Sequence, residues 1–190
     1  MDEKALLKRL VETESPSTDK VAVDRVGAIV ADEARRLGAD VEIVPVMDAG
    51  DHIIARWGKS PSPSERGARD EGWILLLCHM DTVFPLGTLE KMPYREADGK
   101  IFGPGVLDMK AGIVISLGAI ETLQKNGGLN RPVTLLCTSD EETGSLTSEE
   151  LIKGLAGKSE LALVMEPALL DGSLKTWRKG GGEFWIKVNG

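Results

Sequence analysis

Four places in this sequence put ionisable side chains where an apolar run ends or a helical pattern begins. They follow "WILLLC", "PVTLLCTS" and "LALVM", or lie within "GPGVLDMKAG". The residues concerned are His79, Asp81, Asp108, Asp140, Glu141, Glu142 and Glu166. Carboxylates that gather in one place repel one another unless a positive group lies among them, and no lysine or arginine cluster accompanies these acids. A divalent cation would balance the charge.

The ligand types indicate which metal this would be. One imidazole with several carboxylates and no thiolate is typical of zinc, with cobalt or manganese as alternatives. His79 and Asp81 are two residues apart, so in an extended chain they point the same way. Asp81 could then accept the free ring N–H of His79 and fix its tautomer. Glu141 and Glu142 are adjacent and would point apart, which lets one bind the metal while the other faces a bound water.

Each acid also has an ordinary structural role open to it. Glu141 and Glu142 could form a solvated turn, since glutamates are mostly exposed. Asp81 could form a turn, and Asp108 could cap the following helix, a role that is compatible with metal binding. The repetition of acids after apolar runs favours a site over these separate roles.

The apolar pattern predicts the elements that would position these groups. Helical spacing occurs over residues 6–11, 23–37, 110–125 and 148–155, and strand patterns occur over 39–46, 52–57, 73–78, 132–139 and 161–165. The last three strands are continuously apolar, as expected for strands buried on both faces. Residues 58–72 are predicted to be a loop, and residues 174–190 two strands joined through glycines.

Apolar strands that alternate with helices indicate an α/β fold. We expect a mixed, mostly parallel sheet with helices on both faces. In such sheets binding groups gather at the carboxyl ends of the strands, which is where the acids lie.

Composition restricts the class of protein. The formal net charge of −7 argues against nucleic-acid binding, and no apolar run is long enough to span a bilayer. The start "MDEKALLKRL" lacks a secretory signal, so a cytoplasmic location is expected. Cys78 and Cys137 lie in apolar runs and are predicted to be buried free thiols. His52, the only other histidine, is predicted to be a surface or strand-edge residue rather than a ligand.

Taken together, the motifs "HMDTV", "GPGVLDMKAG", "TSDEETGS" and "MEPA", in this order, resemble those of the di-zinc aminoacylase/carboxypeptidase family. This family includes acetylornithine deacetylases, succinyl-diaminopimelate desuccinylases and folate-cleaving glutamate carboxypeptidases. The segment "HMDTVFPLGTLEKMPYREADGKIFGPG" is most similar to the last group. The resemblance runs from the first predicted helix to residue 190 and implies a zinc exopeptidase-like fold.

The resemblance also implies a set of metal ligands. Asp108 would bridge two zinc ions. His79 and Glu166 would complete the protein ligands of the first metal, and Glu142 would bind the second.

The same resemblance implies the catalytic roles. Glu141 would be the general base, and Asp81 would orient His79 as its hydrogen-bond partner. A cis peptide is expected at Asp108–Met109, directly after the bridging aspartate.

The resemblance further implies what lies outside these 190 residues. Family members bind the second metal with a downstream histidine and carry a lid domain that contacts substrate and forms a homodimer. We therefore expect residues 1–180 to be the N-terminal portion of the catalytic domain, truncated before the lid, and 181–190 to begin the connection into that lid or dimerisation domain. The second metal would keep only Asp108 and Glu142, so activity of this chain alone is expected to be weak or absent.

The sequence is therefore interpreted as part of a metal-dependent hydrolase of amide bonds. The expected substrates are small peptides or N-acyl amino acids, with release of a C-terminal glutamate or a similar amino acid. Two alternatives stay open. One is an N-acyl amino-acid deacylase resembling acetylornithine deacetylase, and the other is a non-catalytic metal-binding or dimerisation fragment.

Overall fold

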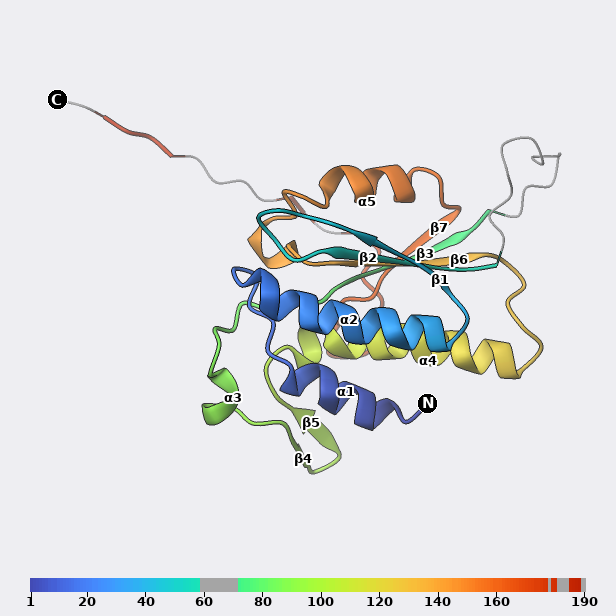
Figure 1. The fold of residues 1–190 in the computed structure, drawn as a ribbon, viewed down its shortest axis with the longest axis horizontal. Coiled ribbons are helices and arrows are strands. Elements are labelled where there is room, and N and C mark those ends of the chain that lie inside the picture. Colours follow the sequence, from blue (N-terminus) through green and yellow to red (C-terminus); the bar gives the residue numbers. More distant parts are fainter. Residues whose placement is uncertain (59–71, 178, 181–184, 189–190) are drawn as a thin grey trace.

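A computed structural model of the chain describes residues 1–58, 72–177, 179–180 and 185–188. Its centre is a five-stranded sheet with the strand order β1-β2-β6-β3-β7 (Figure 1). The strands of this sheet are β1 (Asp40–Val44), β2 (His52–Trp57), β3 (Ile74–His79), β6 (Val133–Thr138) and β7 (Leu161–Val164). The helices are α1 (Glu3–Glu12), α2 (Lys20–Arg36), α3 (Thr88–Lys91), α4 (Ala111–Lys125) and α5 (Glu149–Ala156). A separate hairpin pairs β4 (Arg95–Ala97) with β5 (Lys100–Phe102).

The sheet is mixed, as predicted. β3 runs parallel to both β6 and β7, whereas β2 is antiparallel to both β1 and β6. Only residues 45–51 connect β1 to β2, which is too short for a crossover and enforces a hairpin. Because β2 is antiparallel to β6, the amino end of β2 lies at the same end of the sheet as the carboxyl ends of β3 and β6.

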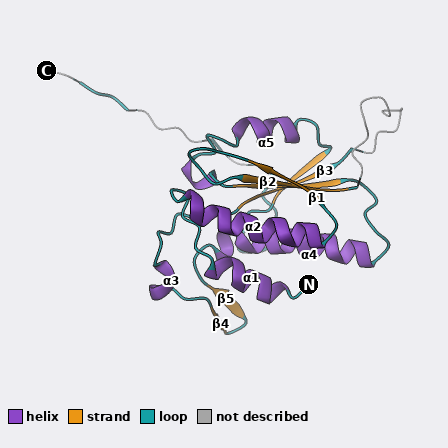
Figure 2. Cartoon of the chain, viewed as in Figure 1, coloured by secondary structure: helices purple, strands orange, loops and turns teal. Residues whose placement is uncertain are grey.

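Helices cover both faces of the sheet, which confirms the predicted layers (Figure 2). Helices α1, α2 and α4 lie on one side and α5 on the other (Figure 1). The larger core contains Leu10, Val30, Ile53, Ile113 and Leu135, all at most 2% exposed. The smaller core beneath α5 contains Ile54, Leu75 and Leu136. Alternate residues of one strand serve opposite faces, so β6 is buried along its whole length.

Strand β7 corrects one prediction. The run "LALVM" is apolar like the central strands, but Leu161, Leu163 and Val164 are 41–58% exposed. Within the described residues β7 pairs with β3 alone and forms the edge of the sheet. Full burial needs neighbours that the apolar character of a strand does not itself supply.

The predicted strands over residues 174–190 are also wrong where the structure describes them. Residues 174–177 and 185–188 are not in strands, and they are exposed. A strand needs a partner for its backbone groups, and none lies beside these residues in the described part of the chain. Most of the predicted loop over 58–72 lies outside the described residues. Cys78 and Cys137 are buried free thiols, as predicted.

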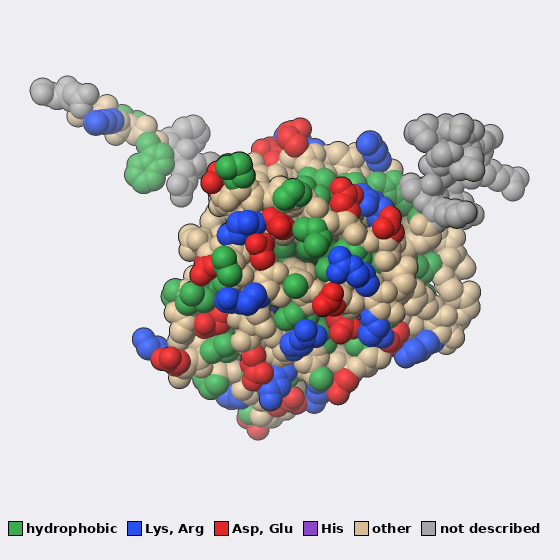
Figure 3. Space-filling view, in the orientation of Figure 1, with side chains coloured by type: hydrophobic (Ala, Val, Ile, Leu, Met, Phe, Trp, Pro, Cys, Tyr) green, Lys and Arg blue, Asp and Glu red, His purple; other side chains and the backbone are tan. Residues whose placement is uncertain are grey.

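The surface shows no broad field of one charge on the face drawn in Figure 3. Acidic and basic side chains alternate there, with small apolar areas between them. Among the helices in the described parts of the chain, none combines the length and the apolar character needed to cross a membrane.

Candidate metal and catalytic site

The carboxyl ends of β3 and β7 bring the predicted site residues around one histidine. His79 is the last residue of β3 and is 2% exposed. Its Nε2 lies 3.0 Å from Asp108 Oδ1, 3.2 Å from Glu166 Oε1 and 3.8 Å from Glu141 Oε2. Three carboxylates from separate segments therefore converge on one ring nitrogen.

Three of these side chains are close enough to share a metal ion. Ligand atoms of His79, Asp108 and Glu142 all lie within 4.8 Å of one another. Within the described residues, no lysine or arginine forms an ion pair with Asp108, Glu142 or Glu166. One imidazole and a set of unbalanced carboxylates suit a divalent cation in chemistry and in charge. Glu166 lies beside His79 but outside this group of three.

Asp81 lies against the other ring nitrogen of His79. The distance from Nδ1 is 3.3 Å to Asp81 Oδ1 and 3.1 Å to the backbone oxygen of Asp81. The carboxylate, which is fully buried, also accepts hydrogen bonds from the backbone N–H groups of Glu141 and Glu142, at 3.3 and 3.2 Å, and from Ser17 Oγ at 2.7 Å. Asp81 thus contacts the ring of the histidine, and its carboxylate also holds the turn that carries both glutamates, a contact that sequence reasoning missed.

Within the cluster formed by His79, Asp81, Asp108, Glu141, Glu142 and Glu166, the pKa values of His79, Glu141 and Glu142 are shifted. Burial opposes a charge on His79, but hydrogen bonds to Asp81 and Glu166 outweigh it and raise the pKa of His79 to about 11. The pKa of Glu141 and the pKa of Glu142 are both raised, first by burial and then by neighbouring carboxylates, with His79 opposing. A raised carboxylate pKa suits a general base that works near neutral pH.

A glycine turn delivers Asp108 to the cluster. Gly105 has φ +69°, and a Cβ there would lie 2.6 Å from Thr82 Cγ2. Only glycine fits such a close approach in a left-handed conformation. The cis peptide implied by the resemblance is present at Asp108–Met109. Two residues later, buried Lys110 donates from Nζ to the backbone oxygens of Leu10 and Thr13, at 2.8 and 2.9 Å.

The burial of Lys110 and its contacts with α1 were not predicted from the sequence. Its side chain lies 1% exposed and ties the Asp108 segment to the end of α1. The signal in the sequence was a lysine at the entry to a helix whose first ten residues, 111–120, include one polar side chain, that of Ser116. Lysine is almost never fully buried without partners, so this position requires the two carbonyl acceptors.

Helix α4 packs closely against the segment that carries Glu166. A Cβ at Gly112 would lie 2.2 Å from the backbone oxygen of Met165. The absence of a side chain at this position lets β7 approach α4 and places Glu166 beside His79.

Asp140 serves the loop rather than the cluster. Its Oδ2 accepts hydrogen bonds from the backbone N–H of Thr147 at 2.7 Å, from Thr147 Oγ1 at 2.7 Å and from the backbone N–H of Ser148 at 3.2 Å. Burial acts to raise the pKa of Asp140, but these donors outweigh it and hold the pKa below its usual value. The loop that carries Glu141 and Glu142 is therefore closed by its own first residue.

His52 is not at the surface or on an edge strand, contrary to prediction. It is 1% exposed and lies in β2, between β1 and β6. Its Nδ1 lies 3.0 Å from Ser139 Oγ and its Nε2 lies 3.2 Å from Thr147 Oγ1. The antiparallel pairing of β2 with β6 brings His52 to the end of the sheet where the site lies. No spacing in the sequence reveals that pairing.

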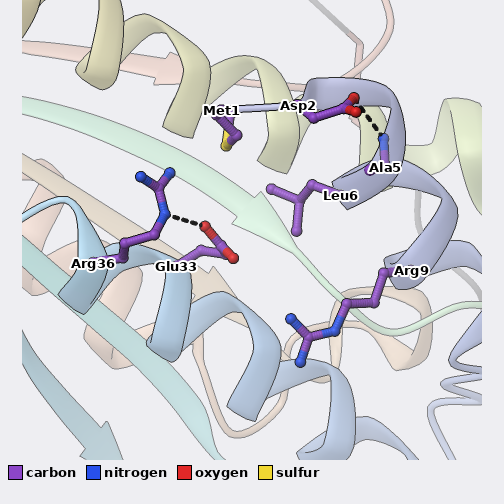
Figure 4. Close-up of a pocket in the computed structure, with 7 residues that line it drawn as sticks. All are labelled: Met1, Asp2, Ala5, Leu6, Arg9, Glu33 and Arg36. Carbon is purple, nitrogen blue, oxygen red and sulfur yellow. Dashed lines mark hydrogen bonds and ion pairs between the residues drawn. The ribbon is translucent and has the colours of Figure 1, made fainter.

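Two hollows of the surface differ in whether they lie beside the site residues. A cavity of about 190 Å³ lies against the cluster, with Leu77, Ile152 and Val164 in its walls beside Glu141 and Glu166. A second hollow lies between α1 and α2 (Figure 4). There Arg36 pairs with Glu33 at 2.7 Å and Asp2 caps α1 through Ala5, so these charges already have partners. Of the two, only the first combines apolar walls with a convergent polar group.

Comparison with known proteins decides the family. The model for peptidase family M20/M25/M40 matches residues 75–178, a segment that contains every residue of the cluster. The chain belongs to this family. This M20-family chain is 32% identical to carboxypeptidase G2 from Pseudomonas sp. (strain RS-16) over 164 residues, which cover 85% of the chain and 37% of that protein. It is 28% identical to acetylornithine deacetylase from Photorhabdus laumondii over 174 residues, 87% of the chain and 42% of that protein.

The fold agrees with the family. The crystal structure of human carnosine dipeptidase 1 has a TM-score of 0.74 to this M20-family chain at 21% sequence identity, covering 89% of the chain and 39% of that structure. The chain thus spans about two fifths of the length of these relatives. Membership of the family implies that the chain binds a divalent metal, and His79, Asp108 and Glu142 form a group that could hold one.

Proposed function

We propose that this chain carries the zinc-binding first half of the active site of an amide-bond hydrolase. The observation that supports this most is the convergence of Asp108, Glu142 and Glu166 around the buried ring of His79. His79, Asp108 and Glu166 would hold the first zinc, and Asp108 and Glu142 would hold a second. Zinc suits the single imidazole and the carboxylates, with cobalt and manganese as substitutes.

The residues of the chain divide the remaining work. A bound zinc would supply Lewis acidity to the scissile carbonyl and to water. Glu141, with its raised pKa, would take a proton from the attacking water and pass it to the leaving amine. Asp81 would keep the ring of His79 in one tautomer and orientation.

The substrate would be a small peptide or an N-acyl amino acid. The relative at 32% identity is a carboxypeptidase, which favours release of a C-terminal glutamate or a similar residue. The relative at 28% identity is a deacetylase and supports acyl-amide hydrolysis as the second candidate. A non-catalytic metal-binding or dimerisation fragment is the alternative from another class.

The domain assignment is part of the same proposal. Residues 1–180 would form the N-terminal portion of the catalytic domain, and 181–190 would lead into a lid and dimerisation domain of a cytoplasmic homodimer. Only Asp108 and Glu142 would then remain to the second metal, so we expect one zinc to bind and turnover to be slight.

Zinc analysis after exhaustive dialysis, followed by zinc titration, tests the metal site. We expect near-stoichiometric zinc in the chain and its loss in His79→Gln. Absence of zinc binding at any concentration would contradict the proposal for this chain.

Hydrolysis of peptides that end in glutamate, and of N-acetyl amino acids, tests the reaction. Glu141→Gln should keep its zinc and abolish any turnover. An unchanged rate in that variant would contradict the role of Glu141 as base, and robust turnover by the chain alone would contradict its incompleteness.

A further inference from the structure

His52 is buried, but the proposed hydrolysis gives it no role. Its side chain is 1% exposed, so each ring nitrogen depends on a protein partner. Nδ1 faces Ser139 Oγ at 3.0 Å, and Nε2 faces Thr147 Oγ1 at 3.2 Å. The two hydroxyls stand at opposite ends of the segment that contains Glu141 and Glu142.

A neutral imidazole carries one N–H, so one ring nitrogen of His52 donates and the other accepts. Nδ1 accepts from Ser139 Oγ, whose single hydrogen is shared between this nitrogen and the backbone oxygen of Gly50, two residues before β2 begins. Thr147 Oγ1 donates to Asp140 Oδ2 at 2.7 Å, which leaves its lone pairs for the ring N–H of His52. A continuous path of hydrogen bonds therefore joins β2, through His52 and Thr147, to the carboxylate that closes the loop.

Loop 140–148 is closed internally by hydrogen bonds to Asp140, and parts of it are exposed. Leu146 is 82% exposed, and the Glu141 side chain is 50% exposed. Asp81 holds its first turn through the backbone N–H groups of Glu141 and Glu142. His52 reaches the far end of the loop, so the two anchors together restrain both ends of the segment that presents the base and a metal ligand.

We propose that His52 is a positioning residue, which fixes loop 140–148 through its hydrogen bond to Thr147 and so holds Glu141 and Glu142 at the metal site. The catalytic consequence of this role rests on the proposed function. The closure of the loop does not depend on the proposed function, because the hydrogen bonds that close the loop join protein groups to one another. His52 lines neither the cluster nor the cavity beside it, so it acts through the two residues that it contacts, Thr147 and Ser139.

Two replacements of His52 separate its two hydrogen bonds. The amide of glutamine reaches the place of Nε2 and can bond to Thr147, whereas the shorter asparagine reaches the place of Nδ1 and can bond only to Ser139. Thr147→Val removes the same bond from the other side at nearly constant volume, together with the bond from Thr147 Oγ1 to Asp140 Oδ2. The His52→Asn, Thr147→Val double variant shows whether the two single effects are one interaction.

Amide hydrogen exchange of Thr147 and Ser148 in the metal-free protein is the first measurement. Both N–H groups are bonded to Asp140 Oδ2, so their exchange reports the closure of the loop. We expect about tenfold faster exchange in His52→Asn, a larger increase in Thr147→Val, no increase beyond that of Thr147→Val in the double variant, and near-normal exchange in His52→Gln. Equal exchange in His52→Asn and the parent protein, or additive effects in the double variant, would overturn the proposal.

Zinc affinity in the same variants is the second measurement. Partners outside the ligand set typically change metal affinity by about 10- to 100-fold, and we expect roughly tenfold weaker zinc binding in His52→Asn with recovery in His52→Gln. If the parent protein binds no zinc, the proposed function fails, while hydrogen exchange still decides the role of His52. If zinc binds equally well to the parent and to His52→Asn, the positioning role fails and the proposed function stands.

Discussion

The two histidines of this chain are equally buried and differ in what surrounds them. His79 is 2% exposed and faces carboxylates on both ring nitrogens, whereas His52 is 1% exposed and faces two hydroxyls. Carboxylates raise the pKa of His79 to about 11. Burial lowers the pKa of His52, although Asp140 opposes that shift. Burial is therefore common to both histidines, and the carboxylates around His79 are what make it the candidate metal ligand.

The difference follows from strand direction. His79 ends a parallel strand, and the acids that follow other strands or open a helix meet it at one end of the sheet. His52 begins an antiparallel strand and reaches the same end of the sheet from the other direction. This end of the sheet thus holds a candidate ligand and a candidate support for the loop beside it.

Replacing His79 should produce the largest effect. His79→Gln removes the only imidazole in the group and should weaken zinc binding at least about 100-fold, measured by calorimetric titration. His52→Gln is the matched control and should stay close to the parent protein. Equal losses in the two variants would mean that any change to a buried histidine disturbs the site.

Gly112→Ala should sharpen the comparison by disturbing only the surroundings of His79. Its Cβ would lie 2.2 Å from the Met165 backbone oxygen, so β7 and Glu166 must shift. We expect the free energy of unfolding in denaturant to fall by about 1–3 kcal/mol and zinc binding to weaken.

Gly154→Ala is the control for this clash. Gly154 lies within α5 and has open space around the position of its Cβ. The change should raise the free energy of unfolding by about 0.5–1 kcal/mol. The same stability in both alanine variants would contradict the close approach at Gly112.

Metal binding should release a proton from one histidine and not from the other. At pH 8 metal-free His79 is protonated, because its folded pKa is raised to about 11, and a metal needs the neutral ring. Zinc affinity should therefore rise roughly tenfold per pH unit between about pH 7 and 9. His52 is neutral there because its pKa is lowered, so it contributes nothing. Calorimetry in buffers of different ionisation enthalpy counts the protons, and zero protons released at pH 8 would contradict the assignment.

A smaller effect than those at His79 and Gly112 is expected in the loop on the His52 side. Asp140→Asn should lower the free energy of unfolding by about 1 kcal/mol at pH 7, because hydrogen bonds to a carboxylate are replaced by weaker ones to an amide. The folded pKa of Asp140 lies below its usual 3.8. Its contribution to stability is therefore present above pH 3.8 and is lost as the pH falls through the lower folded value. The stability difference between the two proteins should shrink below pH 4, and a constant difference would contradict this.

Much of the fold could be predicted because periodicity is a local property. The apolar runs over 52–57, 73–78 and 132–139 formed β2, β3 and β6, and the helical pattern over 110–125 formed α4. Candidate site residues could be predicted because carboxylates are costly to place beside buried strands, so their recurrence at several strand ends indicates a shared ligand. The exposure of β7 could not, since it depends on which neighbour lies beside it in space.

The sequence by itself determined the chemistry that is available to this protein. It places one histidine and several carboxylates where strands end and helices begin, and these residue types select a divalent cation whatever the exact fold.

Only the tertiary structure decided how that chemistry is supported. The contacts from Lys110 to α1, from Asp81 to the turn at Glu141, and from His52 to Thr147 join residues 60 to 100 positions apart. Such contacts depend on strand order and direction, which arise from packing the whole chain around its cores and leave no periodic trace in any one segment.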